Sequence, residues 1–250
     1  MDTSNALARR SVLITGAARR IGAALARGFH AEGANVCIHF HRSATEAEQL
    51  RDELNASREG SAICAAGDLL DLDALPSLVE RATRAFGRLD VLINNASSFY
   101  PTPVGAVTAK QWDDLMGTNL RAPLFLSQAA APALRDAHGL ILNMIDIHAQ
   151  RPLPQHPVYS SAKAGLVMLT RSLARELGPE VRVNGIAPGP ILWPEGGLDE
   201  SLKQEIVDKT LLKRSGSPAD IVRAALFFAK DAPFVTGQIL AIDGGRSVGW

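Results

Sequence analysis

The sequence predicts an α/β protein in which a single domain is built on a doubly wound parallel sheet of about seven strands, with helices on both faces. Apolar runs of strand length alternate along the chain with amphipathic segments of helix length, as is typical of repeated β-α-β units. Several runs are nearly continuous in Val, Ile and Leu, which indicates strands covered on both faces. The 250 residues contain no Pro/Gly-rich linker, internal repeat or low-complexity tract, so we expect one domain.

The expected elements alternate from the start of the domain to its end. The strands are expected at Ser11–Thr15, Asn35–Phe40, Ser61–Ala66, Val91–Asn94, Gly139–Met144, Val181–Ile186 and Gln238–Ile242. The helices are expected at Ile21–Glu32, Thr45–Asn55, Leu72–Phe86, Gln111–Asp136, Val158–Leu177 and Pro218–Ala229, with a short one around Glu200–Lys209. We expect residues 1–10, which are polar and then basic, to form a flexible tail before the domain at 11–250.

The composition argues against several classes of partner. Lys plus Arg and Asp plus Glu both number 26, so the formal net charge is zero, and we expect neither nucleic acid nor an acidic membrane as a partner. The chain contains no apolar run of signal-peptide or membrane-span length, which predicts a soluble, cytoplasmic protein. Cys37 and Cys64 lie in strand-like segments, where we interpret them as small buried hydrophobic residues, and we expect no metal site.

The first strand leads into a glycine-containing loop that suits a pyrophosphate. Gly16 permits a sharp turn, Gly22 permits close packing of helix on strand, and the free N–H groups at the helix start attract phosphate. Arg20 occupies a place where a third glycine is common in such loops. We expect its guanidinium to point into the site, towards a phosphate or an electron-rich substrate ring, whereas the neighbouring Arg19 is expected in solvent.

The end of the second strand discriminates between nicotinamide cofactors. NAD sites usually place an acidic residue there to bind the ribose 2′-hydroxyl. This chain instead has His41, Arg42 and Ser43, whose positive charge and hydrogen-bond donors suit a 2′-phosphate. The sequence therefore predicts NADP(H) as the cofactor.

Tyr159 and Lys163 are candidates for proton transfer. They lie four residues apart at the start of a predicted helix, so both side chains lie on one helical face. A free phenol is a weak acid at neutral pH, and a nearby ammonium favours the phenolate and lowers the tyrosine pKa. The pair predicts a proton donor for carbonyl or imine reduction.

Over essentially its whole length the chain resembles the short-chain dehydrogenase/reductase family, which has a Rossmann-type fold. The motifs that carry the resemblance are Thr15-Gly16 with Gly22, Asp68-Leu69, Asn94-Asn95-Ala96, Asn119, Tyr159 with Lys163, Pro188-Gly189 and Asp243-Gly244-Gly245. The resemblance implies that Lys163 also holds the nicotinamide ribose, and that Asn119 holds a helix distortion and a proton-relay water. It further implies that Asp68 lies near the adenine and Asn95 near the ribose. Other implied cofactor contacts are Ile21, Leu69, Ala96, Pro188 and Gly189.

One departure from the family pattern narrows the predicted class of substrate. The family usually has a catalytic serine thirteen residues before the tyrosine, and this chain has Asp146 there. A carboxyl group beside a phenol can accept hydrogen bonds, or donate one if its pKa is raised in a partly buried site. A ketone needs neither, whereas a pterin, with its amino-pyrimidinone ring and reducible ring nitrogens, can use both.

Several segments are similar to the pteridine reductases in particular. They are the loop from Gly16 to Arg20, the run from His39 to Ser43, the stretch from Asn94 to Pro101, and Asp146. The resemblance implies a pterin between the nicotinamide and Phe99, with Arg20 touching pterin and cofactor phosphate, and Ser97 near the pterin. Leu153, Leu192 and Trp193 either line the pterin side-chain pocket or pack within a substrate lid expected at about 188–218. We interpret His148 and His156 as surface or loop residues.

The resulting hypothesis is an enzyme that reduces dihydrobiopterin- or dihydrofolate-type pterins with NADPH and forms a homotetramer through its two long helices, Gln111–Asp136 and Val158–Leu177. The segment from Gly244 to Trp250 is expected to reach a neighbouring subunit. A dihydromonapterin reductase and a general carbonyl or 3-oxoacyl reductase remain open as alternatives. A non-catalytic NADP-sensing regulator is disfavoured because the chain keeps both Tyr159 and Lys163.

Overall fold

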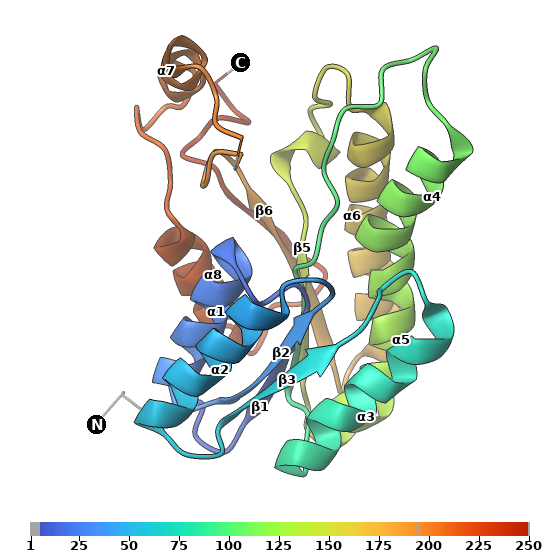
Figure 1. Cartoon of the computed structure of the whole chain (residues 1–250), viewed down its shortest axis with the longest axis vertical. Coiled ribbons are helices and arrows are strands. Elements are labelled where there is room, and N and C mark those ends of the chain that lie inside the picture. The colour runs from blue at the N-terminus through green and yellow to red at the C-terminus, as the bar shows by residue number, and fades with distance from the viewer. Residues whose placement is uncertain (1–5, 195, 250) are drawn as a thin grey trace.

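A computed structural model describes residues 6–194 and 196–249, and the strands in these residues form one parallel sheet (Figure 1). The strand order is β3-β2-β1-β4-β5-β6-β7, and every neighbouring pair is parallel. The strand bounds are β1 Ser11–Ile14, β2 Asn35–Phe40, β3 Ala62–Ala66, β4 Val91–Asn94, β5 Leu140–Met144, β6 Arg182–Pro188 and β7 Ile239–Ile242. The predicted α/β fold class is confirmed.

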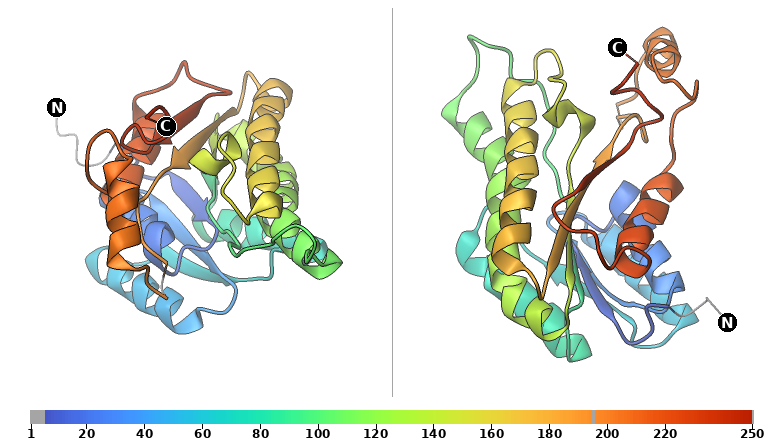
Figure 2. Two further views of the ribbon diagram at one scale, coloured as in Figure 1. Left: turned by 90° about the horizontal axis from the view of Figure 1, so that it is seen from above. Right: turned by 180° about the vertical axis from the view of Figure 1, so that it is seen from behind.

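Helices cover both faces of this sheet, as Figures 1 and 2 show. One hydrophobic cluster joins the sheet to α1, α2 and α8, and a second joins it to α3, α5 and α6. Because successive strand side chains point to opposite faces, Val12 and Ile14 belong to the first cluster and Leu13 to the second. The helix bounds are α1 Arg20–Ala31, α2 Ala44–Ser57, α3 Leu75–Phe86, α4 Ala109–Met116, α5 Ala122–Asp136, α6 Pro157–Leu177, α7 Glu200–Asp208 and α8 Pro218–Lys230.

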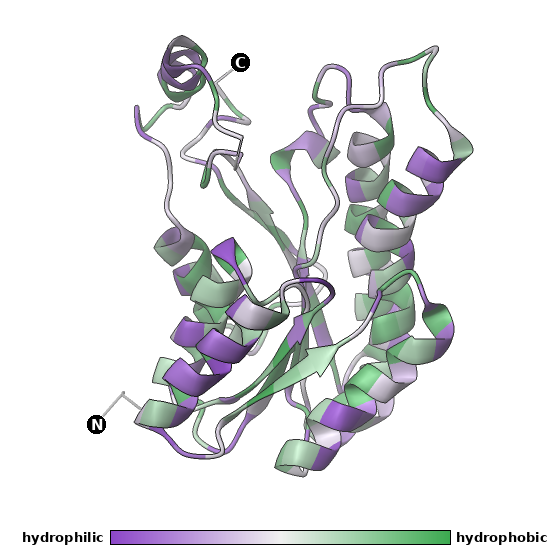
Figure 3. Cartoon of the chain, viewed as in Figure 1, coloured by the Kyte–Doolittle hydropathy of each residue, from purple (hydrophilic) through white to green (hydrophobic). Residues whose placement is uncertain are grey.

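Hydropathy follows these layers (Figure 3). Hydrophobic residues run along the strands, while hydrophilic residues recur on the outer surfaces of helices such as α2 and α3. Within the part of the chain that the structure describes, none of the helices has both the length and the apolar character needed to cross a membrane.

The order of the strands fixes where ligands can bind. The chain moves outward from β1 to β2 and β3, then returns to place β4 on the other side of β1. The loops that leave the carboxyl ends of β1 and β4 therefore diverge and leave a crevice between them, the usual ligand site of an open α/β sheet. The predicted phosphate loop follows β1, and the segment containing Phe99 follows β4.

The expected long helix at Gln111–Asp136 is interrupted in the structure. A π-helical turn, η2 (Gly117–Arg121), separates α4 from α5. Asn119 lies in this turn, and its Nδ2 donates to the carbonyl of Leu115 at 3.0 Å. The side-chain amide of Asn119 thus donates to a backbone carbonyl of the preceding helix. Such π turns are frequent at functional sites. The helix distortion that the family resemblance implied lies here.

The N-terminal segment differs from the expected flexible tail. Leu7 is 1% exposed, and its N–H donates to the carbonyl of Glu32 at 2.9 Å. Burial of this one large apolar side chain ties residues 6–10 to the end of α1. Residues 1–5 of the predicted tail, Glu195 of the predicted lid and Trp250 lie outside the described residues.

Gly22 tests the close packing of α1 on the loop after β1. A Cβ there would lie 2.2 Å from the carbonyl oxygen of Gly16 and 2.8 Å from the Cα of Ala17, so backbone would have to move. We expect Gly22→Ala to lower the free energy of unfolding by about 3 kcal/mol in urea titrations. Gly196→Ala is the control, because its Cβ meets no described atom within 4 Å. Equal stability of the two variants would contradict the packing argument.

Candidate active site

The loop after β1 approaches the segment after β4 very closely. Gly16 has a φ of +61°, and a Cβ on it would lie 3.0 Å from the Cα of Ala96. Arg20 also has a positive φ, +56°, a left-handed conformation that costs a non-glycine residue about 1 kcal/mol or more. Arg20 occupies the position where a third glycine is common, and its left-handed backbone conformation is the one that favours glycine. The chain adopts this conformation with an arginine.

The side chain of His39 fixes this loop through hydrogen bonds. The N–H of Gly16 donates to His39 Nδ1 at 3.1 Å, and His39 Nε2 lies 3.2 Å from the carbonyl oxygen of Gly67. Because Nδ1 accepts, the ring proton must be on Nε2, where it donates to Gly67. His39 is 2% exposed, and burial lowers its pKa to about 4, so the ring is neutral. The motif from His39 to Ser43 predicted no separate role for His39.

A cavity of about 500 Å³ lies above this loop at the carboxyl ends of the strands. Its walls bring together residues from five segments of the chain: Gly16, His39, His41, Arg42, Asp68, Leu69, Leu70, Ala96, Ser97, Ser98, Asp114 and Thr118. His41 Nε2 lies 3.8 Å from a carboxylate oxygen of Asp68, so an acidic group from the loop after β3 does face the basic end of β2. The cavity lining therefore includes both the basic end of β2 and Ser97.

Other residues predicted to bind cofactor are placed differently. Asn95 directs its Nδ2 to the carbonyls of Thr15 at 2.8 Å and Gly16 at 3.2 Å, which orders the loop. Ile21 packs against the hydrophobic core, and Ser43 precedes the first residue of α2. Pro188 ends β6, and Gly189 follows it with its N–H donating to the carbonyl of Ile242 at 3.0 Å. These residues therefore order or support the segments that surround the crevice.

Tyr159, Asp146 and Lys163 meet at the other end of the crevice. The hydroxyl of Tyr159 donates to Asp146 Oδ2 at 2.7 Å, and Asp146 Oδ1 accepts the N–H of His148 at 2.8 Å. Lys163 donates to the carbonyl of Met144 at 2.8 Å, and its Nζ lies 5.6 Å from the centre of the Tyr159 ring. The spacing of residues along α6 and β5 thus brings all three predicted groups together.

The protonation of this group differs from the expectation that lysine lowers the tyrosine pKa. Burial and the neighbouring Asp146 carboxylate raise the pKa of Tyr159 well above 10. Tyr159 and Lys163 are 4% and 2% exposed, and burial also lowers the pKa of Lys163 to about 8, although Asp146 acts in the opposite direction. The free-energy cost of removing a phenolate from water exceeds the stabilisation that the Lys163 ammonium gives it from a distance. The phenol therefore holds its proton and can donate it.

Asn119 connects the π turn to the segment after β4. Its Oδ1 accepts the hydroxyl of Ser97 at 2.7 Å, and its Nδ2 donates to the carbonyl of Ser98 at 2.9 Å. Asn119 is buried, whereas Ser97 is exposed in the crevice close to Tyr159. Asn119 thereby fixes the position of Ser97.

Phe99 forms an aromatic wall beside Tyr159. Its ring stacks on His156 with centroids 4.8 Å apart and an interplanar angle of 11°, and it meets Tyr159 edge-on at 4.8 Å and 79°. Phe99 is 49% exposed, so part of this large ring remains open to a ligand. His156, interpreted from sequence as a surface or loop residue, is a member of this aromatic group. Its position directly before Pro157 at the start of α6 was the available signal.

The segment after β6 approaches the phosphate loop. Arg20 Nη2 donates to the carbonyl of Trp193 at 3.0 Å, so the guanidinium contacts the predicted lid. Leu192 is exposed, and Leu153 lies in the loop before α6, where its N–H donates to Ser160 Oγ at 3.3 Å. α7 follows within the predicted lid segment.

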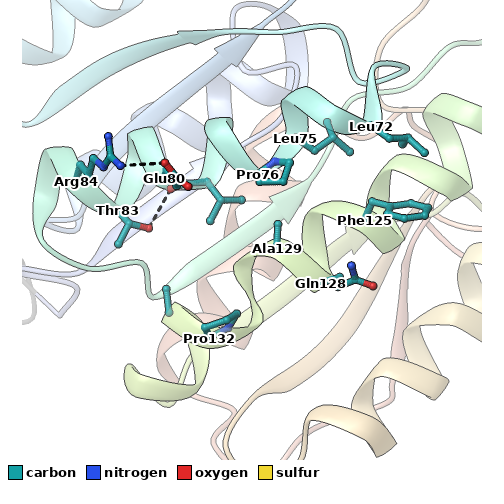
Figure 4. Close-up of a pocket in the computed structure, with 12 residues that line it drawn as sticks. Leu72, Leu75, Pro76, Glu80, Thr83, Arg84, Phe125, Gln128, Ala129 and Pro132 are labelled. Atoms are coloured by element: carbon teal, nitrogen blue, oxygen red, sulfur yellow. Dashed lines mark hydrogen bonds and ion pairs between the residues drawn. The ribbon is translucent and has the colours of Figure 1, made fainter.

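A second groove lies away from this crevice, between α3 and α5 (Figure 4). It has a volume of about 430 Å³, and Leu75, Phe125 and Pro132 are among its mainly apolar lining residues. It contains none of the residues of the Tyr159 group. Among the described residues, no cluster of three or more His, Cys, Asp or Glu side chains is arranged to hold a metal ion.

Comparisons with known proteins agree with this geometry. A family model described as enoyl-(acyl carrier protein) reductase matches residues 16–247. The chain is 35% identical to pteridine reductase 1 of Leishmania tarentolae, over 94% of this chain and 96% of that protein. It is 33% identical to the 3-oxoacyl-(acyl-carrier-protein) reductase FabG of Staphylococcus aureus, over 94% and 97%. It is 37% identical to a probable galactose dehydrogenase, GalD, of Rhizobium meliloti, over 94% of each.

The neutral state of His39 has a measurable consequence. Its pKa falls from 6.5 to about 4 in the folded protein, so only the unfolded chain takes up this proton between those pH values. Folding stability must then decrease as the pH falls from about 6.5 to 4, by about 3 kcal/mol. We expect His39→Asn, which cannot titrate, to remove this part of the pH dependence in urea unfolding.

The matched control for that experiment is His138→Asn, at an exposed histidine. Its pH dependence should follow the wild type. If His39→Asn keeps the full decline in stability, the buried histidine is not the source.

Proposed function

The chain belongs to the short-chain dehydrogenase/reductase family and is an NAD(P)-dependent oxidoreductase, and we propose that it is a pteridine reductase that uses NADPH. The observation that carries the proposal is the 2.7 Å hydrogen bond between the Tyr159 hydroxyl and the carboxylate of Asp146. This carboxyl group stands where the family pattern has a serine, and its partner Tyr159 also contacts the ring of Phe99. The site thus offers a proton donor paired with a carboxylate, together with a flat apolar surface.

The residues present fit NADP(H). The 500 Å³ cavity begins at Gly16, where a side chain would be too close to Ala96, so the backbone can approach a pyrophosphate. His41 and Arg42 at its other end suit the 2′-phosphate, and Asp68 and Leu69 suit the adenine. Lys163 would hold the nicotinamide ribose. A bound NADPH supplies the hydride that reduces the substrate.

The proposed substrate is a dihydropterin or dihydrofolate held against Phe99. A flat heteroaromatic ring gains both apolar burial and stacking on such a wall. Arg20 has guanidinium N–H groups beyond the one donated to Trp193, and the Ser97 hydroxyl, which donates to Asn119, can accept a hydrogen bond from the ring. Leu192 and Trp193, on the segment after β6, are proposed to contact the substituent of the pterin.

The chain's own contribution to the reaction is a proton. When hydride adds to the ring carbon of a C=N bond, the adjacent nitrogen must receive a proton. The Tyr159 hydroxyl holds that proton and donates a hydrogen bond to the Asp146 carboxylate, so the proton can leave from Tyr159 directly or from Asp146 after transfer across this bond. The pair then regains its one proton from solvent. The Lys163 ammonium compensates the negative charge that the pair acquires, and the N–H of His148 fixes the carboxylate.

A second candidate is a 3-oxoacyl-(acyl-carrier-protein) reductase, because FabG proteins align with this chain almost as well as pteridine reductase 1 does. A ketone needs one acid, which Tyr159 provides alone, and it has no use for the Asp146 carboxylate. A dihydromonapterin reductase shares the ring chemistry, and only the contacts to the pterin substituent distinguish it.

We also propose that the enzyme is a homotetramer. Exposed apolar side chains occur on each of the helices α4, α5 and α6, at Trp112, Leu124 and Met168. Pairing of these helices between subunits would remove that apolar surface from water.

Replacement of Asp146 distinguishes the two candidate functions. We expect Asp146→Ala and Asp146→Ser to reduce kcat/KM for 7,8-dihydrobiopterin by about 100-fold or more, because the acid pair is lost. NADPH binding, measured by fluorescence titration, should remain nearly unchanged. Asp146→Ser should retain any reduction of an acetoacetyl thioester, since serine restores the usual family residue.

Asp136→Ala, at an exposed carboxylate, is the control for loss of an acidic group. Full dihydropterin turnover by Asp146→Ala would overturn the proposed function, as would a wild-type enzyme that reduces only the thioester.

The pKa of Lys163 predicts the alkaline limb of the pH profile. Because burial lowers this pKa to about 8, the ammonium loses its proton as the pH rises through that value. The positive charge that compensates Tyr159 and Asp146 is then lost. We expect kcat/KM for NADPH to fall about tenfold per pH unit above about pH 8. A profile that stays flat to pH 10 would rule out Lys163 as the group responsible.

A further inference from the structure

The segment that carries Phe99 is anchored on both sides of the ring. Before it, the carbonyl of Ser98 accepts from Asn119 Nδ2 at 2.9 Å. After it, the hydroxyl of Tyr100 donates to Asp114 Oδ2 at 2.7 Å. The Ser98 hydroxyl lies 3.4 Å from the other oxygen of Asp114, so one carboxylate of α4 contacts both neighbours of Phe99.

The Tyr100 ring extends this anchor into the protein. It packs against a cluster formed by Leu115, Val158 and Tyr159, which lies between α4 and α6. Burial and the Asp114 carboxylate raise the pKa of Tyr100 to about 12, so the phenol keeps its proton at neutral pH. A hydrogen bond to a carboxylate is stronger than one between neutral groups. Tyr100 is therefore held at both its ring and its hydroxyl.

Phe99 itself has much less support. It is 49% exposed and rests on His156 by one face and on Tyr159 by its edge. A half-exposed ring in an irregular segment would lose its orientation if the flanking backbone moved. A substrate would then have to order the segment as it binds, and this entropy cost would weaken affinity.

We propose that Tyr100 and Asp114 are positioning residues that hold Phe99 in place and thereby set the affinity for a flat heteroaromatic substrate. This inference rests on the proposed function, because it concerns the same substrate site. Neither residue makes a hydrogen bond with Asp146 or with the hydroxyl of Tyr159 in the described structure. Their effect should therefore be on KM for the substrate, with little effect on proton transfer.

The two residues differ in one respect that matters for a test. Asp114 also lines the 500 Å³ cavity proposed for NADP(H), whereas Tyr100 is absent from that lining. Tyr100→Phe removes only the hydroxyl and keeps the packed ring and the carboxylate. It is therefore the cleaner variant, and Asp114→Asn provides an independent second variant that weakens the same hydrogen bond from its other end.

The test is steady-state kinetics with 7,8-dihydrobiopterin and NADPH. We expect Tyr100→Phe to raise KM for dihydrobiopterin about tenfold, with kcat and KM for NADPH nearly unchanged. Asp114→Asn should raise the same KM, and the double variant should be no worse than the poorer single variant. Asp113→Asn, at the exposed neighbouring carboxylate of α4, is the control and should behave as the wild type.

A background without the aromatic ring makes the test specific. Phe99→Ala should raise KM for dihydrobiopterin at least as much as Tyr100→Phe does. In that background Tyr100→Phe should have no further effect, because its action passes through Phe99. A residue that merely stabilised the fold would add its own effect.

Two results would overturn the inference: an unchanged KM in both Tyr100→Phe and Asp114→Asn, or equal effects of Tyr100→Phe with and without Phe99. A wild-type enzyme that does not reduce dihydrobiopterin would instead refute the proposed function. If the wild type reduces dihydrobiopterin and both variants keep the wild-type KM, only the positioning role is refuted.

Discussion

The site depends on a set of hydrogen bonds that joins the end of β1 to the end of β4. Thr15 Oγ1 accepts the N–H groups of Asn95 at 2.9 Å and Ala96 at 3.0 Å, while the side chain of Asn95 donates to the Thr15 carbonyl at 2.8 Å. The register of β1 with β4 ends at Ile14 and Ile93, so no further ladder pairs hold the two loops together. The Thr15–Asn95 contacts therefore set the distance between the phosphate loop and the segment containing Phe99.

The π turn extends the same constraint to a third segment. Asn119 binds Ser97 and Ser98, which follow directly after Asn95 and Ala96. A regular α-helix at this point would direct its backbone bonds along its own axis, whereas the wider turn accommodates the side-chain bond from Asn119 to Leu115. The cofactor loop, the aromatic wall and the helix pair α4–α5 are consequently held as one unit, which favours a preorganised site.

The sequence predicted the strands and the Tyr159–Lys163 pair from local spacing, whereas the place of Asp146 beside them was implied by the family resemblance. Tyr159 and Lys163 lie four apart on a helix, and β5 places Asp146 at its carboxyl end. The protonation state could not be predicted, since it depends on burial by distant segments. The same holds for His156, whose stacking partner Phe99 comes from a distant part of the sequence, the segment after β4. His39 carried a usable signal, a histidine inside an apolar strand, which requires buried hydrogen-bond partners.

The presence of Asp146 where the family usually has serine also affects whether the site favours reduction or oxidation. An enzyme of this family that oxidises an alcohol needs Tyr159 as a base, and therefore as a phenolate. A serine hydroxyl can donate to a phenolate and stabilise it, whereas the Asp146 carboxylate repels it and raises the tyrosine pKa. The neutral phenol that results is the proton donor that reduction requires. The carboxylate thus opposes dehydrogenation, although a probable galactose dehydrogenase is 37% identical to this chain. The same residue thus keeps the proton on Tyr159, which favours reduction.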